Sequence, residues 1–91
     1  MTKKIVWTSR FSKDIKRMVK QNKKMNMIHL LITKLGKGES IPARFQPHRL
    51  KGVWKNYLEC HIQPDWLLIW KEDKETVFLT RTGSHSDLLK K

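Results

Sequence analysis

Hydrophobic residues recur at helical spacing over two stretches in the N-terminal half of the chain. They lie three or four residues apart at Phe11, Ile15, Met18 and Val19, and again at Ile28, Leu31, Ile32 and Leu35. Such positions share one side of an α-helix, so the pattern predicts two amphipathic helices separated by a break at residues 22–24. Ser9 or Ser12 is expected to cap the first helix, and Gly36 and Gly38 to end the second.

Short apolar runs with β-branched and aromatic residues predict strands instead. The first is Lys4–Thr8, and three more follow in the second half at Val53–Ile62, Trp66–Lys71 and Thr76–Arg81. The links at residues 63–65 and 72–75 are short and polar, which favours antiparallel neighbours. Residues 38–52 are too irregular for regular structure to be expected, and a last helical turn is predicted at residues 86–89.

The expected order is therefore strand, helix, helix and three strands. Amphipathic helices need a sheet to cover, so the pattern predicts an α+β fold in two layers. Both helices would pack on one face of a mainly antiparallel sheet and leave the other face available. With 91 residues the chain is expected to form a single domain over residues 1–91.

Charge narrows the range of partners. The chain has 20 Lys and Arg against 8 Asp and Glu, a formal net charge of +12. A small domain this basic usually meets a polyanion such as nucleic acid, an anionic membrane or an acidic protein. No apolar run approaches the roughly 20 residues that span a bilayer, and no signal peptide is visible, so a cytoplasmic protein without a membrane partner is expected.

Strand alternation separates apolar from polar side chains near the middle of the second half. Leu58, Cys60 and Ile62 share one face of the expected strand. Tyr57, Glu59 and His61 share the other face. We interpret Cys60, the only cysteine, as a small buried hydrophobe rather than a nucleophile. The opposite face then carries a phenol, a carboxylate and an imidazole.

No metal or cofactor is predicted. The chain has no Cys pair and no Gly-rich phosphate loop. Three histidines, His48, His61 and His85, could gather around zinc, but Cys60 is expected on the wrong strand face and structural zinc usually takes several thiolates. A second role that these imidazoles could have is proton transfer, since imidazole is the side chain that titrates near neutral pH.

Metal-free cleavage of RNA needs a base for the 2′-hydroxyl, an acid for the departing 5′-oxygen and a cation for the phosphorane oxygens. The chain holds all three kinds of group. Composition alone does not establish this chemistry, because scattered His and Arg also occur in basic domains that only bind.

Three literal strings add a resemblance. They are His48-Arg49-Leu50-Lys51-Gly52, then residues 59–69 (ECHIQPDWLLI), then residues 81–88 (RTGSHSDL). Together they strongly resemble the YafQ-type branch of the RelE superfamily, and the resemblance covers the whole chain in element order. It implies the RelE-like fold and the activity of a bacterial type II toxin, a ribosome-dependent mRNA endoribonuclease that inhibits translation.

The resemblance also implies a site. The family's catalytic positions fall on His48, His61, Asp65, Arg81 and His85. We expect His85 as principal general acid or base, His48 and His61 sharing the complementary transfer or holding phosphate, and Asp65 orienting an imidazole or acting as base. Arg81 would neutralise the phosphorane. The products would be a 2′,3′-cyclic phosphate and a free 5′-hydroxyl.

Further positions are expected to contact RNA. They are Glu59, Trp66, Lys51, Leu89 and four lysines of the first helix: Lys13, Lys16, Lys20 and Lys24. Leu89 stands where the family commonly has an aromatic residue, which puts one base-stacking contact in doubt. A core position is the favoured alternative for Trp66, and a solvated helix face is the alternative for the lysines. Strict alternation through Val77 and Leu79 would put Arg81 on the same face as these apolar residues. Either the strand ends before Arg81, or Arg81 is structural and pairs with a carboxylate.

The partners implied are mRNA in the ribosomal A site, the ribosome, and a cognate antitoxin through which operator DNA would be bound. Two other functions stay open. One is a RelE-like module that binds RNA or the ribosome without cleavage, and the other is a ribosome-independent ribonuclease. Retention of His48, His61 and His85 argues against the first, because binding alone does not require imidazoles.

Overall fold

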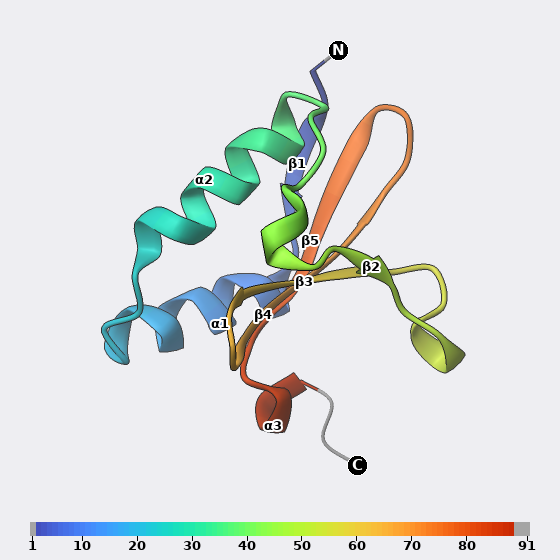
Figure 1. Cartoon of the computed structure of the whole chain (residues 1–91). Coiled ribbons are helices and arrows are strands. Elements are labelled where there is room, and N and C mark those ends of the chain that lie inside the picture. Colours follow the sequence, from blue (N-terminus) through green and yellow to red (C-terminus); the bar gives the residue numbers. More distant parts are fainter. Residues whose placement is uncertain (1, 89–91) are drawn as a thin grey trace.

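The computed structural model describes residues 2–88 (Figure 1). Its elements follow in the order β1 (Lys4–Trp7), α1 (Ser9–Lys20), α2 (Met25–Gly36), η1 (Ala43–Phe45), β2 (His48–Arg49), η2 (Gly52–Trp54), β3 (Leu58–Gln63), β4 (Trp66–Glu72), β5 (Thr76–Gly83) and α3 (His85–Leu88). The symbol η marks a short 3-10 helix. Within the described part of the chain, no helix is both long and apolar enough to cross a bilayer.

The strands form one five-stranded sheet in the order β1-β5-β4-β3-β2. Three of the four neighbouring pairs are antiparallel, and only β1 and β5 run parallel. The chain therefore leaves β1, passes through both helices, and returns to place its last strand beside its first. The predicted α+β fold with a mainly antiparallel sheet is confirmed.

Both N-terminal helices cover the same face of the sheet, as predicted (Figure 1). Their buried apolar side chains meet those of the strands in one cluster, which includes Phe11, Met18, Ile28, Leu31, Leu35, Cys60, Leu68, Trp70, Val77 and Leu79. Removing these side chains from water is the main source of stability for a domain of this size.

The opposite face is only partly available, which corrects the expectation of a free face. Leu67, Ile69 and Leu88 form a second buried cluster there. Leu88 belongs to α3, the short helix that follows β5, and Leu50, Trp54 and Tyr57 pack on the same cluster from the β2–β3 connection. This small apolar patch anchors α3 against the sheet.

Local details at the helix ends differ in part from the prediction. Thr8, not Ser9 or Ser12, caps α1, since its side chain accepts a hydrogen bond from the backbone N–H of Phe11 at 3.1 Å. The predicted end of α2 at Gly36 is confirmed, with Gly38 at φ 74° just beyond it. A left-handed residue after a helix satisfies its last carbonyl groups, which is why glycine is favoured there.

Two strand boundaries were predicted wrongly. Val53–Ile62 is not one strand, because β3 begins only at Leu58 and residues 52–54 form η2. The loop at residues 38–52 is not fully irregular, because His48 and Arg49 form β2 and pair with Glu59 and Leu58. A strand of two residues forms only because it pairs with a neighbouring strand, and it is too short to show an alternating pattern in the sequence.

A register shift between β4 and β5 changes which face a key residue occupies. Leu79 pairs with Trp70, but Arg81 pairs with Ile69, so one extra residue lies in β5 between these pairs. Paired residues share a face, and successive strand residues do not. Arg81 is therefore on the face opposite to Leu79, and the expectation from strict alternation is wrong.

Candidate active site

Three histidines that are distant in sequence meet on the sheet face opposite α1 and α2. His48 comes from β2, His61 from β3 and His85 from the start of α3. The ring centroids are 6.0 Å apart for His48 and His61, and 5.8 Å apart for His61 and His85. The predicted convergence of the three imidazoles is present, with His61 in the middle.

Strand register explains this placement. His48 pairs with Glu59, Glu59 with Ile69, and Ile69 with Arg81, so one row of side chains crosses four strands. His61 lies in the neighbouring row, opposite Leu67. Leu67 and Ile69 carry the apolar cluster that holds α3, and α3 in turn brings in His85. Leu67 and Ile69 thus position the histidines, although their own side chains cannot transfer protons.

The turn into α3 requires a glycine. Gly83 has φ +155°, and a Cβ on it would lie 3.1 Å from a guanidinium nitrogen of Arg17 and 3.2 Å from a carboxylate oxygen of Asp87. Ser84 caps the turn, its hydroxyl accepting from the backbone N–H of Asp87 at 3.1 Å. Gly83 therefore lets the chain turn closely enough for His85 to reach the sheet face.

His48 is held by two hydrogen-bond acceptors. Its Nε2 lies 3.0 Å from Oε1 of Glu59, and its Nδ1 lies 2.8 Å from the backbone carbonyl oxygen of Gln46. A neutral imidazole has only one N–H, so both bonds form together only when the ring carries two protons and a positive charge. The Glu59 side chain is only 5% exposed, whereas that of His48 is 45% exposed, so the carboxylate meets the imidazole from the buried side.

The other oxygen of Glu59 has no partner. Oε2 is buried and accepts no hydrogen bond from any described residue. Glu59 therefore faces His48 instead of solvent, which corrects the expectation that it contacts RNA directly.

His85 is held by one carboxylate only. Its Nδ1 and its backbone N–H both donate to Oδ1 of Asp65, at 2.9 and 3.1 Å. The hydrogen bond from the His85 side chain is the main cause of the lowered pKa of Asp65. With a proton on Nδ1, a neutral His85 presents the lone pair of Nε2, the atom that can accept or return a proton.

Arg81 is bound by a carboxylate that sequence reasoning missed. Its Nε and Nη2 donate to the two oxygens of Asp14, at 2.7 and 3.2 Å. These bonds are the main cause of the raised pKa of Arg81. The backbone N–H of Thr82 and the guanidinium of Arg17 also donate to Asp14, each at 3.1 Å. The structural alternative for Arg81, a pairing with a carboxylate, is therefore present.

The structural role of Asp14 could have been suspected from the sequence. It is the only acidic residue before Glu39, and its spacing from Phe11 and Met18 places it on the apolar stripe of α1. In the structure Asp14 is 2% exposed. A lone acid on the buried side of a basic helix requires a partner, and Arg81 and Arg17 supply it.

Trp66 does not reach the surface. It is fully buried, and its indole N–H donates to the hydroxyl of Thr82 at 2.9 Å, while that hydroxyl donates to the carbonyl oxygen of Leu67 at 2.7 Å. The expected contact between Trp66 and RNA is therefore wrong, and the alternative of a core residue is confirmed. Cys60 is likewise a buried core residue, and burial raises the pKa of its thiol to about 12.

Comparison with known proteins supplies the family. Residues 3–90 match the family described as bacterial toxin of type II toxin-antitoxin system, YafQ. This chain belongs to the YafQ family. The predicted resemblance to YafQ-type toxins and the RelE-like fold are therefore confirmed.

Individual members of the YafQ family show the extent of the similarity. The chain is 38% identical over 85 residues to the mRNA interferase toxin YafQ of Escherichia coli K12, covering 92% of each. It superposes on YafQ in the E. coli DinJ-YafQ toxin–antitoxin complex with a TM-score of 0.89 at 36% identity, over 97% of this chain and 98% of the other. The predicted enzyme class, endoribonuclease, agrees with the name of the E. coli relative.

A third relative raises the question of metals. The structure described as metal-bound toxin from Helicobacter pylori superposes with a TM-score of 0.87 at 34% identity, over 97% of this chain and 99% of that one. In the present YafQ-family chain, ligand atoms of His48, Glu59 and His61 all lie within 4.8 Å of one another. Imidazole nitrogen and carboxylate oxygen suit zinc and copper, so this group can hold such an ion.

The remaining predicted RNA contacts lie at the surface or outside the described region. Lys51 is exposed at the start of η2, and the lysines of the basic face, Lys13, Lys16, Lys20 and Lys24, are all exposed on α1 or just after it. They are available to phosphates, but none makes part of the histidine cluster. Leu89 lies outside the described residues 2–88.

Proposed function

We propose that this YafQ-family protein is an endoribonuclease that cleaves mRNA on the ribosome and thereby inhibits translation. The observation that carries the proposal is the cluster of three imidazoles, two of which are each paired with a carboxylate. The name of the E. coli relative, mRNA interferase toxin, supports mRNA as the substrate. A site that only bound RNA would gain nothing from carboxylates that hold imidazoles in defined protonation states.

The proposed cleavage is a transfer within the RNA. Nε2 of His85 takes the proton from the 2′-hydroxyl, and the 2′-oxygen forms a bond to phosphorus. The bond from phosphorus to the 5′-oxygen breaks, and that oxygen receives a proton. The products are a 2′,3′-cyclic phosphate and a 5′-hydroxyl. Asp65 keeps the proton of His85 on Nδ1 and stabilises the imidazolium as it forms.

His61 and His48 divide the remaining work. No side-chain hydrogen bond within residues 2–88 occupies the His61 ring, and it lies between the other two, so it suits the acid that protonates the 5′-oxygen. His48, doubly hydrogen bonded and paired with Glu59, suits a fixed cation that stabilises the phosphorane oxygens.

Arg81 can pair with Asp14 and still donate hydrogen bonds to a phosphate group. A guanidinium has five N–H donors, and Asp14 takes two of them. Arg81 lies at the far end of the row that begins at His48, three strands away and beside α1, so in this proposal its remaining donors meet phosphate oxygens when the RNA follows that row. In this proposal Asp14 is a positioning residue that fixes the plane of the guanidinium.

The basic face of α1 would supply affinity for ribosomal RNA. Phosphate contacts give binding that is independent of sequence and falls with salt. Replacing Lys13, Lys16, Lys20 and Lys24 together should weaken ribosome binding and reduce its salt dependence, and an unchanged salt slope would remove this role. The same positive charge suits an acidic antitoxin segment, as the DinJ-YafQ complex of E. coli suggests by analogy. Through such an antitoxin, operator DNA would be bound, and the protein would act in the cytoplasm.

We propose a divalent transition metal ion as an inhibitory ligand of the same site. A toxin from H. pylori has been solved metal-bound, and a mutant of one copper-bound. In the present chain His48, Glu59 and His61 are the residues that would hold the ion. Bound there, it would occupy two of the three imidazoles that the proposed cleavage needs.

One experiment separates the candidate functions. Purified protein is incubated with a defined mRNA, with and without translating ribosomes, and the RNA ends are mapped. Cleavage only with ribosomes, leaving cyclic phosphate ends, is the expected result. Cleavage of naked RNA at a similar rate would make the protein a ribosome-independent ribonuclease. Binding without cleavage in both arms would leave only a binding module.

A further inference from the structure

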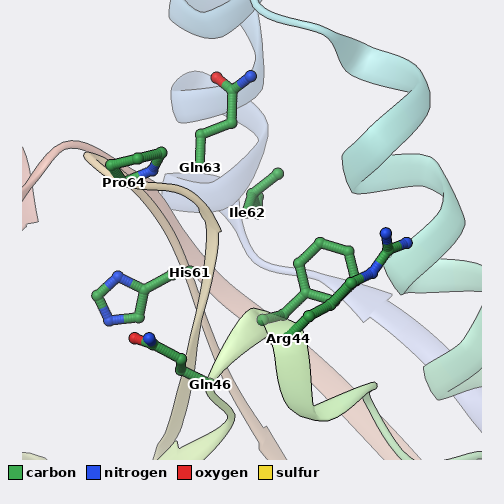
Figure 2. Close-up of a pocket in the computed structure, with 7 residues that line it drawn as sticks. Arg44, Gln46, His61, Ile62, Gln63 and Pro64 are labelled. Carbon is green, nitrogen blue, oxygen red and sulfur yellow. The ribbon is translucent and has the colours of Figure 1, made fainter.

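A cavity of about 490 Å³ opens directly beside the proposed catalytic centre (Figure 2). It is lined by residues of η1 and of the end of β3, and one of these is His61. The volume is within the range of about 300–1,000 Å³ that is typical of small-ligand clefts. Because His61 belongs to both the cavity and the histidine cluster, a group bound in the cavity would be next to the scissile phosphate.

The floor and walls of the cavity differ in chemistry. Phe45 and Ile62 form an apolar floor and are 5% and 3% exposed. Arg44, Gln46 and Gln63 supply polar groups around it. None of the lining residues is acidic, so the cavity does not repel RNA. An apolar floor with a few amides suits a flat ring with hydrogen-bonding edges, which describes a nucleobase.

The amides lie on two sides of the cavity, and Nε2 of Gln63 is 3.9 Å from Sδ of Met27, a weak hydrogen bond that a base edge can replace. Figure 2 shows the Gln46 amide beside the His61 imidazole, and Gln63 farther along β3, next to Pro64. Gln46 has φ 54°, a left-handed conformation that follows η1, and its carbonyl oxygen lies 2.8 Å from Nδ1 of His48. The residue that fixes His48 through its backbone therefore presents its side chain to the cavity.

The cavity exists because β3 extends beyond the end of its partner strand β2. β2 pairs only with Leu58 and Glu59, so the outer edge of β3 beyond Glu59 has no strand partner among the described residues. η1 approaches this edge instead and brings Phe45 against Ile62. Arg44 lies with its guanidinium carbon 4.7 Å from the Phe45 ring centroid. A guanidinium plane of this kind can stack on a base.

We propose that this cavity binds one nucleobase of the RNA next to the scissile phosphate, and that the amides of Gln46 and Gln63 read its hydrogen-bonding edge. The inference rests on the proposed nuclease function and names its specificity subsite. An amide offers a donor and an acceptor together, so it discriminates among bases by the pattern of groups on their edges. Arg44 contributes stacking or a phosphate contact and carries less of the discrimination.

The test compares cleavage preferences of the wild type with those of Gln63→Met and Gln46→Met. These substitutions keep the side-chain length and remove the amide. Gln21→Met is the matched control, since Gln21 is exposed at the end of α1 and does not line the cavity. Translated mRNAs that differ in one nucleotide beside the cut are cleaved, and relative kcat/KM is measured for each base at that position.

We expect each cavity variant to lose discrimination among bases by about 5- to 100-fold, as removal of a paired amide contact predicts. Cleavage of the disfavoured sequences should persist, and Gln21→Met should match the wild type. Unchanged preference in both cavity variants would overturn the inference while leaving the nuclease proposal intact. A wild-type protein that cleaves no sequence, with or without ribosomes, would overturn both.

A binding measurement avoids dependence on activity. An RNA oligonucleotide with a 2′-deoxy sugar at the cut is not cleaved, and it is added to the wild-type protein while side-chain amide resonances are followed by NMR. The Gln46 and Gln63 amides should shift and the Gln21 amide should not. Equal responses of all three amides in the wild-type protein would contradict a base-reading cavity.

Discussion

Two carboxylate–histidine pairs flank the candidate site, and they have nearly the same length in very different surroundings. Nε2 of His48 is 3.0 Å from Glu59, and Nδ1 of His85 is 2.9 Å from Asp65. The Glu59 side chain is 5% exposed, whereas that of Asp65 is 69% exposed. The two imidazoles are similarly exposed, at 45% for His48 and 50% for His85, so the pairs differ in how far water screens the carboxylate. The two hydrogen bonds are therefore nearly equal in length, but their contributions to the free energy of unfolding are expected to differ.

The difference suits the two proposed roles. Two acceptors, the buried Glu59 carboxylate and the Gln46 carbonyl oxygen, fix the His48 ring in place, which suits the proposed role of stabilising charge on a phosphorane. The exposed Asp65 carboxylate orients His85 while leaving the ring able to exchange protons with solvent and substrate. The comparison predicts that loss of His85 damages activity alone, while loss of His48, which leaves the buried Glu59 carboxylate unpaired, also damages stability.

The largest effect is expected for His85→Ala. Removing a general acid or base typically costs about 10²- to 10⁴-fold in rate, so mRNA cleavage on ribosomes should fall to that extent. The unfolding free energy should stay near the wild-type value, because both His85 and Asp65 are exposed. Single-turnover cleavage and chemical denaturation measure the two quantities. A folded and active variant would rule out the assignment of His85.

His48→Ala should affect both activity and folding. It leaves the buried Glu59 carboxylate without its partner, which should lower the unfolding free energy by about 1–3 kcal/mol. Cleavage should also fall, by about 10²-fold or more for loss of a charge-stabilising group. The measurements are urea denaturation and single-turnover cleavage.

The double variant His48→Ala/Glu59→Gln provides the control for this interpretation. It removes the uncompensated charge, so it should recover part of the lost stability without recovering cleavage. If the double variant is no more stable than His48→Ala alone, the buried charge is not the source of the defect.

Metal addition should affect the His48–Glu59 side of the site. Zn²⁺ or Cu²⁺ bound by His48, Glu59 and His61 should inhibit cleavage, and a chelator selective for these ions over Mg²⁺ should restore it while the Mg²⁺ that ribosomes require stays in place. The same chelator alone should not reduce cleavage, because the proposed mechanism uses no transition metal. Glu59→Gln should weaken metal binding by about 10- to 100-fold in a titration calorimeter, whereas Asp65→Asn should leave it unchanged. Equal weakening by both variants would contradict the assigned ligands.

The smallest effect is expected for Asp65→Asn on stability. The pKa of Asp65 is lowered in the folded protein by its bonds with His85. The carboxylate therefore contributes stability above its unfolded pKa of about 3.9, and this contribution is lost as the pH falls through the lower, folded value. Thermal unfolding of wild type and variant between pH 7 and pH 3 should show a small difference that shrinks below about pH 4. A difference that grows in acid would contradict this sign.

Much of the fold was predictable because its signals are local. The stripes that contain Phe11 and Leu31 repeat within a single helix, and the resemblance carried by the strings around His61 and His85 needed no coordinates. The elements that were missed depend on partners. β2 at His48–Arg49 exists only through β3, and the shifted register that moves Arg81 to the other face depends on β4.

The candidate site divides in the same way. His48, His61, Asp65, Arg81 and His85 were named from the sequence, and the structure brings the three imidazoles together as expected. Asp14 was missed because its role depends on a contact with β5, 67 positions away from it at Arg81. Trp66 and Glu59 were placed wrongly among RNA contacts, because the type of a residue does not tell how exposed it is in the folded protein.

The sequence by itself determined the two helices, the family and the identity of the groups that can move protons. These follow from side-chain chemistry and from spacings within short segments. Only the tertiary structure decided which carboxylate serves which imidazole, that one of these carboxylates is buried and the other exposed, and that a cavity opens beside His61. Those properties depend on strand register and on what water can reach, and both are set only when distant segments pack together.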